Sequence, residues 1–121
     1  MVLSTKLKNA ISKKKEGLVF SLKNTIINGE KRGCSGFIYN PENGITVYVN
    51  TEPASFSLKY MYRYCKNMRD YRGFTNYWAK SLDELTDGII ALLKNSRQYE
   101  LVLGVNSKWL LRGKQVRRIY E

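Results

Sequence analysis

Hydrophobic and polar residues alternate with different periods along the chain, and each period predicts a different element. Between residues 2 and 15, the apolar residues Leu3, Leu7, Ala10 and Ile11 share one helical face, and lysines surround them. A single apolar stripe is typical of an amphipathic helix that packs on a core. We therefore expect a short helix at the N-terminal end.

Several later stretches alternate apolar and polar residues at period two, which is the spacing of β-strands. The first is 18–23, and two more, 36–39 and 45–49, flank a segment at 40–44 that contains proline, asparagine and glycine. β-branched and aromatic runs on either side of such a segment predict a hairpin. The polar stretch at 28–33 is predicted to be a loop.

Residues 55–68 fit two patterns. Strict alternation favours a strand with these residues on one face: Phe56, Leu58, Tyr60, Tyr62 and Tyr64. A helical stripe formed by Leu58, Met61, Cys65 and Met68 also fits. We favour the strand because four of the alternating residues are aromatic and prone to β-structure, and the helix stays open as an alternative. The strand interpretation places a turn near 69–73 and a partner strand at 74–79.

The stretch Ser81-Leu82-Asp83-Glu84 has the form of a capping box. In such a box the Ser81 hydroxyl accepts from the Glu84 amide, and the Glu84 side chain reaches back to the Ser81 amide. An apolar stripe follows and predicts a helix at about 82–95. In the tail, two or three short strands are expected at 99–103, 108–112 and 116–120.

Together these elements predict an α+β fold in a single domain, 1–121. We expect an antiparallel sheet of five or more strands, an N-terminal amphipathic helix, and a second helix (about 82–95) packed on one face.

Charge adds a preference for one class of partner. The chain carries 21 Lys and Arg against 10 Asp and Glu, a net charge of +11. A net charge of roughly 2–8 in magnitude is enough to keep a small domain soluble. Because the additional positive charges repel one another, a polyanionic partner is the simplest explanation for them. Positive charge gathers in residues 1–15, 53–81 and 101–121, whereas the helix at 82–95 is acidic.

The middle basic block mixes cations with aromatic rings, as in proteins that bind single-stranded nucleic acid. The candidate phosphate contacts are Lys59, Arg63, Lys66, Arg69 and Arg72, with Lys13–Lys15, Arg117 and Arg118 widening the field. Tyr71 and Trp78 are the candidate stacking rings because they lie nearest the predicted turn. The plainer alternative is that aromatic residues of one parity form a buried sheet face and that the cations only solvate the other face.

The sequence gives little support for catalysis or for binding of a metal or cofactor. The chain has no histidine, so Ser-His and Cys-His pairs cannot form, and we expect no catalytic residues, no metal and no cofactor. Asp83 and Asp87 are explained by the helix dipole. The segment 33–36 is predicted to be a turn, with a phosphate-binding nest as the alternative. Cys34 lies close to the cations Lys31 and Arg32, and such neighbours can lower the pKa of a thiol. A reactive Cys34 stays open as an alternative to a cysteine without a functional role.

Targeting features point to the cytoplasm. Lysines interrupt every apolar block near residue 1, so no secretory signal is expected, and the two cysteines should be reduced thiols. No run is apolar enough to span a membrane, and membrane binding by the lysine-rich helix is disfavoured because it lacks aromatic anchors.

Two function hypotheses follow. The first is a non-enzymatic, basic nucleic-acid-binding protein with weak sequence selectivity, for DNA or RNA with single strands favoured. If it neutralised about five to seven phosphates, its affinity would fall with a log–log salt slope on the order of −4 to −6. The alternative is a protein-interaction module, a small inhibitor or adaptor that binds an acidic partner protein. Composition resembles that of phage or mobile-element accessory proteins, and the oligomeric state stays open.

Overall fold

The structure is a computed structural model that describes residues 2–53, 58–73 and 75–103. Five strands form one antiparallel sheet whose spatial order, β1-β2-β3-β4-β5, is also the chain order. The strands are β1 (Val19–Ile27), β2 (Glu30–Asn40), β3 (Ile45–Pro53), β4 (Leu58–Cys65) and β5 (Tyr77–Ala79). The helices are α1 (Leu3–Lys14), α2 (Leu82–Lys94) and α3 (Ser96–Leu103). The predicted α+β fold, with an N-terminal helix and a second helix on the sheet, is confirmed.

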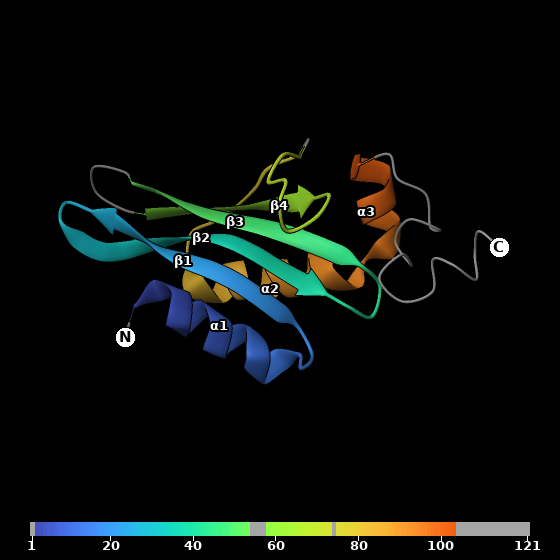
Figure 1. Ribbon diagram of the computed structural model, residues 1–121, viewed down its shortest axis with the longest axis horizontal. Helices are drawn as coiled ribbons and strands as arrows, with labels where there is room; N and C mark the ends of the chain where they lie inside the picture. The colour runs from blue at the N-terminus through green and yellow to red at the C-terminus, as the bar shows by residue number, and fades with distance from the viewer. Residues whose placement is uncertain (1, 54–57, 74, 104–121) are drawn as a thin grey trace.

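The sheet has two unlike faces. Helices α1 and α2 lie against one of them, whereas the segment between β4 and β5 lies over the other (Figure 1). We call the first the covered face; it carries Phe20, Leu22, Cys34, Ile38, Val47, Val49, Tyr62 and Tyr64. We call the second the open face; it carries Ser21, Lys23, Phe37, Tyr48, Asn50, Met61, Arg63 and Trp78.

The hydrophobic core fills the space between the covered face and the two helices. Leu7 and Ile11 of α1 are fully buried, as the helical stripe predicts. Helix α2 contributes Leu85, Ile89 and Leu93, which are also fully buried. Each such side chain contributes roughly 1.5–3 kcal/mol when removed from water. This layer therefore covers one face of the sheet.

The connection between β1 and β2 is much shorter than the predicted loop at 28–33. Only Asn28 and Gly29 form the turn, with φ of 54° and 81°, and β2 already begins at Glu30. An Asn-Gly pair with both φ angles positive is the favoured two-residue hairpin turn. The polarity of the stretch was therefore misleading, because an exposed hairpin end tolerates charged residues in a strand: Glu30 and Lys31 pair with β1, and Arg32 lies where the register shifts.

The segment 33–36 is also a strand and not the predicted turn. Gly33 to Gly36 pair with β1 in the ladder, and Cys34 donates its N–H to Thr51 Oγ1 at 3.0 Å. Gly36 has φ of 147°, and a Cβ built there would lie 2.0 Å from the Ser21 carbonyl oxygen. Glycine is needed at this position because β1 passes too closely for any side chain.

Helix α2 begins as the capping box predicts and is anchored at both ends. Ser81 Oγ accepts from the Glu84 N–H at 3.1 Å, but the Glu84 carboxylate accepts from the Lys80 N–H instead of from Ser81. At the other end, Asn40 and Asn43 both donate to the Leu93 carbonyl at 2.9 Å. Those amides satisfy a carbonyl that a helix end leaves without an intrahelical partner.

The predicted strand at 99–103 is wrong, because this stretch belongs to helix α3. Asn95 starts the helix by accepting the Gln98 N–H at 2.9 Å through its side chain. Tyr99 then packs edge-on against Tyr64, with 5.2 Å between ring centroids, and donates its hydroxyl to the Cys65 carbonyl at 2.8 Å. This tertiary contact explains why a β-prone sequence is helical here. The strands predicted at 108–112 and 116–120 lie outside the described residues.

The disputed stretch 55–68 forms a strand over Leu58–Cys65 and not a helix, and its partner strand is shorter than expected. β4 pairs with β3 along its whole length, while β5 covers only three residues of the predicted 74–79. Tyr62 and Tyr64 are buried, so the expectation that these tyrosines belong to the core is confirmed. Phe56 lies outside the described residues.

Candidate nucleic-acid interface

The open face brings together aromatic rings from three parts of the chain. The register places Phe37 of β2, Tyr48 of β3 and Arg63 of β4 side by side in one row across the sheet. The rings of Phe37 and Tyr48 are 5.3 Å apart between centroids. Tyr71, from the segment after β4, adds a third ring at 5.5 Å from Tyr48. Such tilted pairs add about 0.5–1.5 kcal/mol beyond the area they bury.

Arg63 joins this row of rings to the segment above it. Its guanidinium lies 5.2 Å from the Tyr48 ring centroid and 5.7 Å from that of Tyr71. Its Nε donates to the Tyr71 carbonyl at 2.9 Å, and Nη1 donates to Asn76 Oδ1 at 3.1 Å. Burial raises the pKa of Tyr48, and the nearby Arg63 charge opposes that rise. Arg63 is therefore a positioning residue that fixes Tyr71, more than an available phosphate contact.

Two rings of this surface remain open to solvent. Tyr71 is 56% exposed and Trp78 is 47% exposed. Trp78 stands opposite Met61 in the register of β4 and β5, so its side chain belongs to the open face. An exposed tryptophan and an exposed tyrosine on one side of a sheet are the geometry that stacking on unpaired bases requires.

The cations around these rings fall into two groups. Lys59, Lys66 and Arg69 are exposed, and Lys66 and Arg69 form no ion pair within the described residues. The backbone register, however, sets the acidic residue Glu52 opposite Lys59. The charge of Arg72 is already matched, because its Nε and Nη2 donate to the two carboxylate oxygens of Asp70, at 2.8 and 3.0 Å.

The turn after β4 shows why Asp70 holds Arg72. Asn67 Oδ1 accepts the Arg69 N–H at 2.8 Å, and Asp70 Oδ1 accepts the Arg72 N–H at 3.1 Å. These side-chain turns keep the segment compact without regular structure. The Arg72 guanidinium, together with its backbone N–H, lowers the pKa of Asp70 to about 2. Asp70 is consequently ionised and reduces the positive potential beside Tyr71.

The structure thus assembles only part of the predicted site. Tyr71 and Arg63 touch, Trp78 and Lys59 share their face, and Lys66, Arg69 and Arg72 follow in the adjoining segment. Arg117 and Arg118 lie outside the described residues. Lys13–Lys15 belong to the end of α1, on the covered side of the sheet, and do not border these rings.

Three residues that contribute to this surface were not predicted from the sequence: Phe37, Tyr48 and Asn76. The alternation of the predicted hairpin contained the signal for the first two. Phe37 and Tyr48 have the opposite parity to the core residues Ile38, Val47 and Val49. Their side chains therefore had to leave the core face. No sequence signal identified Asn76, whose role depends on a contact with Arg63 made across the fold.

The other candidate residues from the sequence have structural contacts in the described part of the chain. No group of three or more metal-ligating side chains occurs in the part of the chain that the structure describes. Asp87 forms an ion pair with Lys14, and Asp83 lies in the first turn of α2. Burial raises the pKa of the Cys34 thiol to about 11, which overturns the alternative of an activated cysteine. Cys65 is likewise buried with a raised pKa, and it lies on the opposite sheet face from Cys34.

A comparison of the chain with protein families, curated proteins and solved structures finds no match in any of the three. Among the helices in the described ranges, none is long and apolar enough to cross a membrane. The function must therefore be argued from the geometry of the open face.

Proposed function

We propose that this chain is a non-enzymatic protein that binds single-stranded nucleic acid on the open face of its sheet. The observation that carries the proposal is that two exposed rings, Tyr71 and Trp78, belong to the same region of the chain as the exposed cations of β4 and of the segment after it. The rings would stack on bases, and Lys59, Lys66 and Arg69 would attract phosphates. A cytoplasmic location and a phage or mobile-element origin are proposals that rest on sequence composition alone.

Single strands suit this surface better than duplexes. Stacking on a side chain requires a base whose face is accessible, and in a duplex neighbouring base pairs cover both faces. The sequence contains no helix-turn-helix, zinc-finger or RNA-recognition pattern, so sequence selectivity should be weak. DNA and RNA would be distinguished only if a 2′-hydroxyl found a partner.

The geometry lowers the expected dependence on salt. Arg63 donates to neutral groups of its own chain and Arg72 is paired with Asp70. If Lys59, Lys66 and Arg69 each neutralise one phosphate, the log–log slope for a single strand is about −2. This is shallower than the −4 to −6 that the count of basic residues alone suggests.

The test is fluorescence anisotropy of labelled oligomers about twelve nucleotides long, single- and double-stranded, from low to physiological salt. Tyr71→Ala and Trp78→Ala should each weaken single-strand binding by about five- to one-hundredfold, as expected for one lost base stack. The double charge reversal Lys66→Glu with Arg69→Glu should weaken binding further and flatten the salt slope.

A matched control separates the local surface from overall charge. Lys6→Glu with Lys13→Glu makes the same change in net charge on α1, on the covered side of the sheet. That variant should retain nearly all of the affinity. Absence of binding at low salt, or equal losses in the control and the open-face variant, would contradict the proposal.

A further inference from the structure

A second surface lies at the edge of the sheet formed by β1. This strand has nine residues, stands first in the strand order, and pairs with β2 alone among the described strands. Alternate residues of an antiparallel edge strand direct their N–H and C=O groups outward. Such a row of unpaired groups is a template for one more strand.

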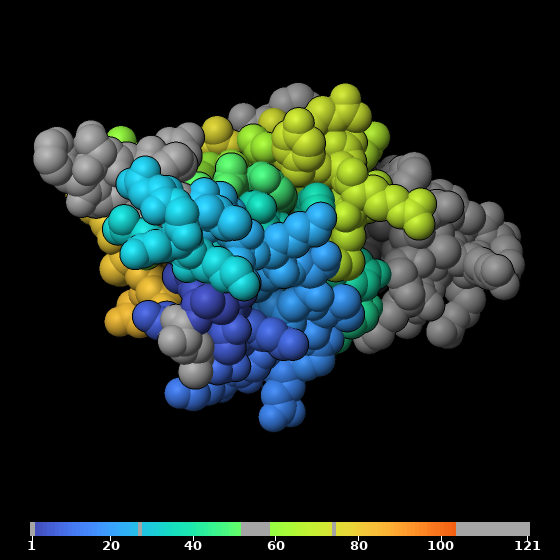
Figure 2. All heavy atoms as spheres, turned by 60° about the vertical axis from the view of Figure 1, so that its left-hand side comes forward, coloured from blue at the N-terminus to red at the C-terminus, as the bar shows by residue number. Residues whose placement is uncertain are grey.

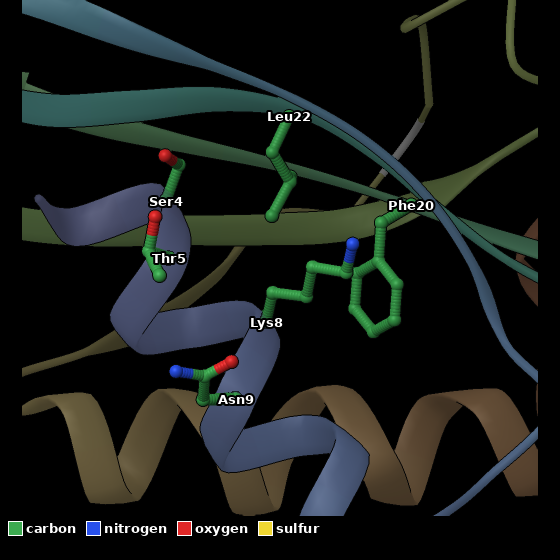
Figure 3. A pocket seen from close by; sticks show the side chains of 6 residues that line it. All are labelled: Ser4, Thr5, Lys8, Asn9, Phe20 and Leu22. Atoms are coloured by element: carbon green, nitrogen blue, oxygen red, sulfur yellow. The ribbon is translucent and has the colours of Figure 1, made fainter.

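The edge has a hollow beside it that would receive side chains of an added strand. It has a volume of about 330 Å³ and lies between α1 and β1. Its lining residues are Ser4, Thr5, Lys8, Asn9, Phe20 and Leu22. Figure 3 shows Phe20 and Leu22 pointing from β1 toward α1, with Lys8 reaching to the Phe20 ring, 5.7 Å from its centroid. The hollow thus combines an apolar side with a cation.

The two elements at this edge carry charge of one sign. Helix α1 and strand β1 contain lysines but no aspartate or glutamate. Figure 2 shows these two segments next to each other on the side of the molecule toward the viewer. Lys8 lies in the hollow, and Lys23 is exposed in the middle of β1. The complementary occupant is therefore acidic.

A second copy of this chain fits the edge poorly. Antiparallel pairing of two full-length β1 strands would place Lys23 directly opposite Lys23 of the other copy, because it is the central residue of Val19–Ile27. Like charges facing each other across strands are destabilising. Val19 and Ile26, exposed by 45% and 67%, still offer apolar contacts near the two ends. An acidic residue opposite Lys23 turns the repulsion into attraction.

We propose that β1 binds an extended, acidic segment of a partner protein as an additional strand of the sheet. Main-chain hydrogen bonds to β1 provide the attachment, and alternate side chains entering the hollow provide selectivity. Apolar side chains on one face of the segment contact Phe20 and Leu22 in the hollow, and carboxylates on its other face lie beside Lys23. The hollow lies on the covered side of the sheet, whereas Tyr71 and Trp78 belong to the open side.

The probe is a capped nine-residue peptide of alternating valine and glutamate, titrated into the full chain labelled with ¹⁵N. We expect amide shifts concentrated in β1 and in the first two turns of α1. Lys23→Glu should raise Kd about three- to tenfold, which corresponds to reversing one surface charge contact. Lys66→Glu, a charge reversal beyond the end of β4, should leave the peptide's Kd unchanged.

Two control peptides test the mode of binding. A peptide with proline at its centre cannot donate all of the strand hydrogen bonds, and it should lose most of the affinity. A valine–lysine peptide of the same length should not bind. The proposal is overturned if either control binds as well as the acidic peptide, if no β1 amide shifts, or if sedimentation shows the chain alone already dimerises through β1.

Discussion

Tyr64 of β4 and Tyr48 of β3 occupy adjacent strands of one sheet, but their rings lie on opposite faces. Tyr64 is fully buried, contacts Tyr99 edge-on, and donates its hydroxyl to the Asn95 carbonyl at 3.3 Å. Tyr48 is partly exposed and lies between Phe37 and Tyr71, with the Arg63 guanidinium nearby. The same residue type therefore serves the core on one face and a solvent-accessible cluster on the other.

This difference indicates how stability and binding are divided between the faces. The covered face is packed against α1 and α2, and Tyr64 also against Tyr99 of α3, so its rings cannot be removed without leaving a cavity. On the open face, polar contacts from Arg63 hold the cluster, and water already reaches its outer rings. Substitutions on the covered face should therefore lower the free energy of unfolding, and substitutions on the open face should lower the affinity for nucleic acid.

The largest effect is expected for Tyr64→Ala. Loss of a fully buried ring should lower the free energy of unfolding by about 3–5 kcal/mol. Urea unfolding followed by circular dichroism measures this loss. Tyr71→Ala, the counterpart on the open face, should cost less than about 1.5 kcal/mol. Similar losses in the two variants would remove the distinction between the faces.

Gly36→Ala should have the next largest effect, because it separates β1 from the rest of the sheet. The new Cβ would meet the Ser21 carbonyl oxygen at 2.0 Å and the Leu22 Cα at 2.9 Å, in a backbone conformation that L residues rarely adopt. We expect a loss of about 2–4 kcal/mol. Gly17→Ala is the control, since its φ is also positive, at 82°, but nothing lies within 4 Å. An equal cost in both would mean that backbone strain, and not the clash, decides.

The covered face could be predicted from the sequence, because its signals are local. The alternation of Tyr60, Tyr62 and Tyr64 has the period of a strand with one buried face. The spacing of Leu7 and Ile11 has the period of a helix with one buried face. Two predictions were wrong because the composition of the stretch did not indicate which element it forms. Charged residues at 30–32 concealed a strand that the Asn28-Gly29 turn starts, and Tyr99 draws a β-prone segment into α3.

The candidate site was only half predictable for a related reason. The sequence shows which residues are basic or aromatic, and it correctly indicated that Tyr71 and Trp78 are exposed. Whether a cation is available depends on contacts made after folding. The sequence did not reveal that Arg63 would donate to Tyr71 and Asn76, or that Asp70 would engage Arg72.

Arg63→Lys tests that positioning role and should have a moderate effect. Lysine keeps the charge but cannot reproduce the fork that contacts the Tyr71 carbonyl and Asn76 together. We expect a loss of about 1–2 kcal/mol and faster hydrogen exchange at the amides of residues 69–73. Single-strand affinity should fall because Tyr71 is no longer held. Lys59→Arg, on the same strand and face, should change neither quantity. Unchanged exchange rates in Arg63→Lys would show that the segment is held by its own turns.

The smallest effect is expected for Asp70→Asn, which raises the charge of the open-face surroundings by one. The amide keeps an oxygen for the Arg72 N–H but no longer neutralises the guanidinium. Single-strand affinity at low salt should improve about two- to fivefold, and the log–log slope should steepen by about 0.7. Asp83→Asn, the same change in α2, should not improve binding; equal affinity in both would show that Arg72 faces away from the nucleic acid.

The same variant has a pH signature of defined sign. The folded-state pKa of Asp70 is about 2, below its usual 3.8, so ionised Asp70 stabilises the fold fully above about pH 4. That stabilisation is lost as the pH falls through about 2. The stability difference between the unmodified chain and Asp70→Asn should therefore be constant near neutrality and shrink between pH 4 and pH 2. A difference that grows with acid would mean that the carboxylate is not held by Arg72.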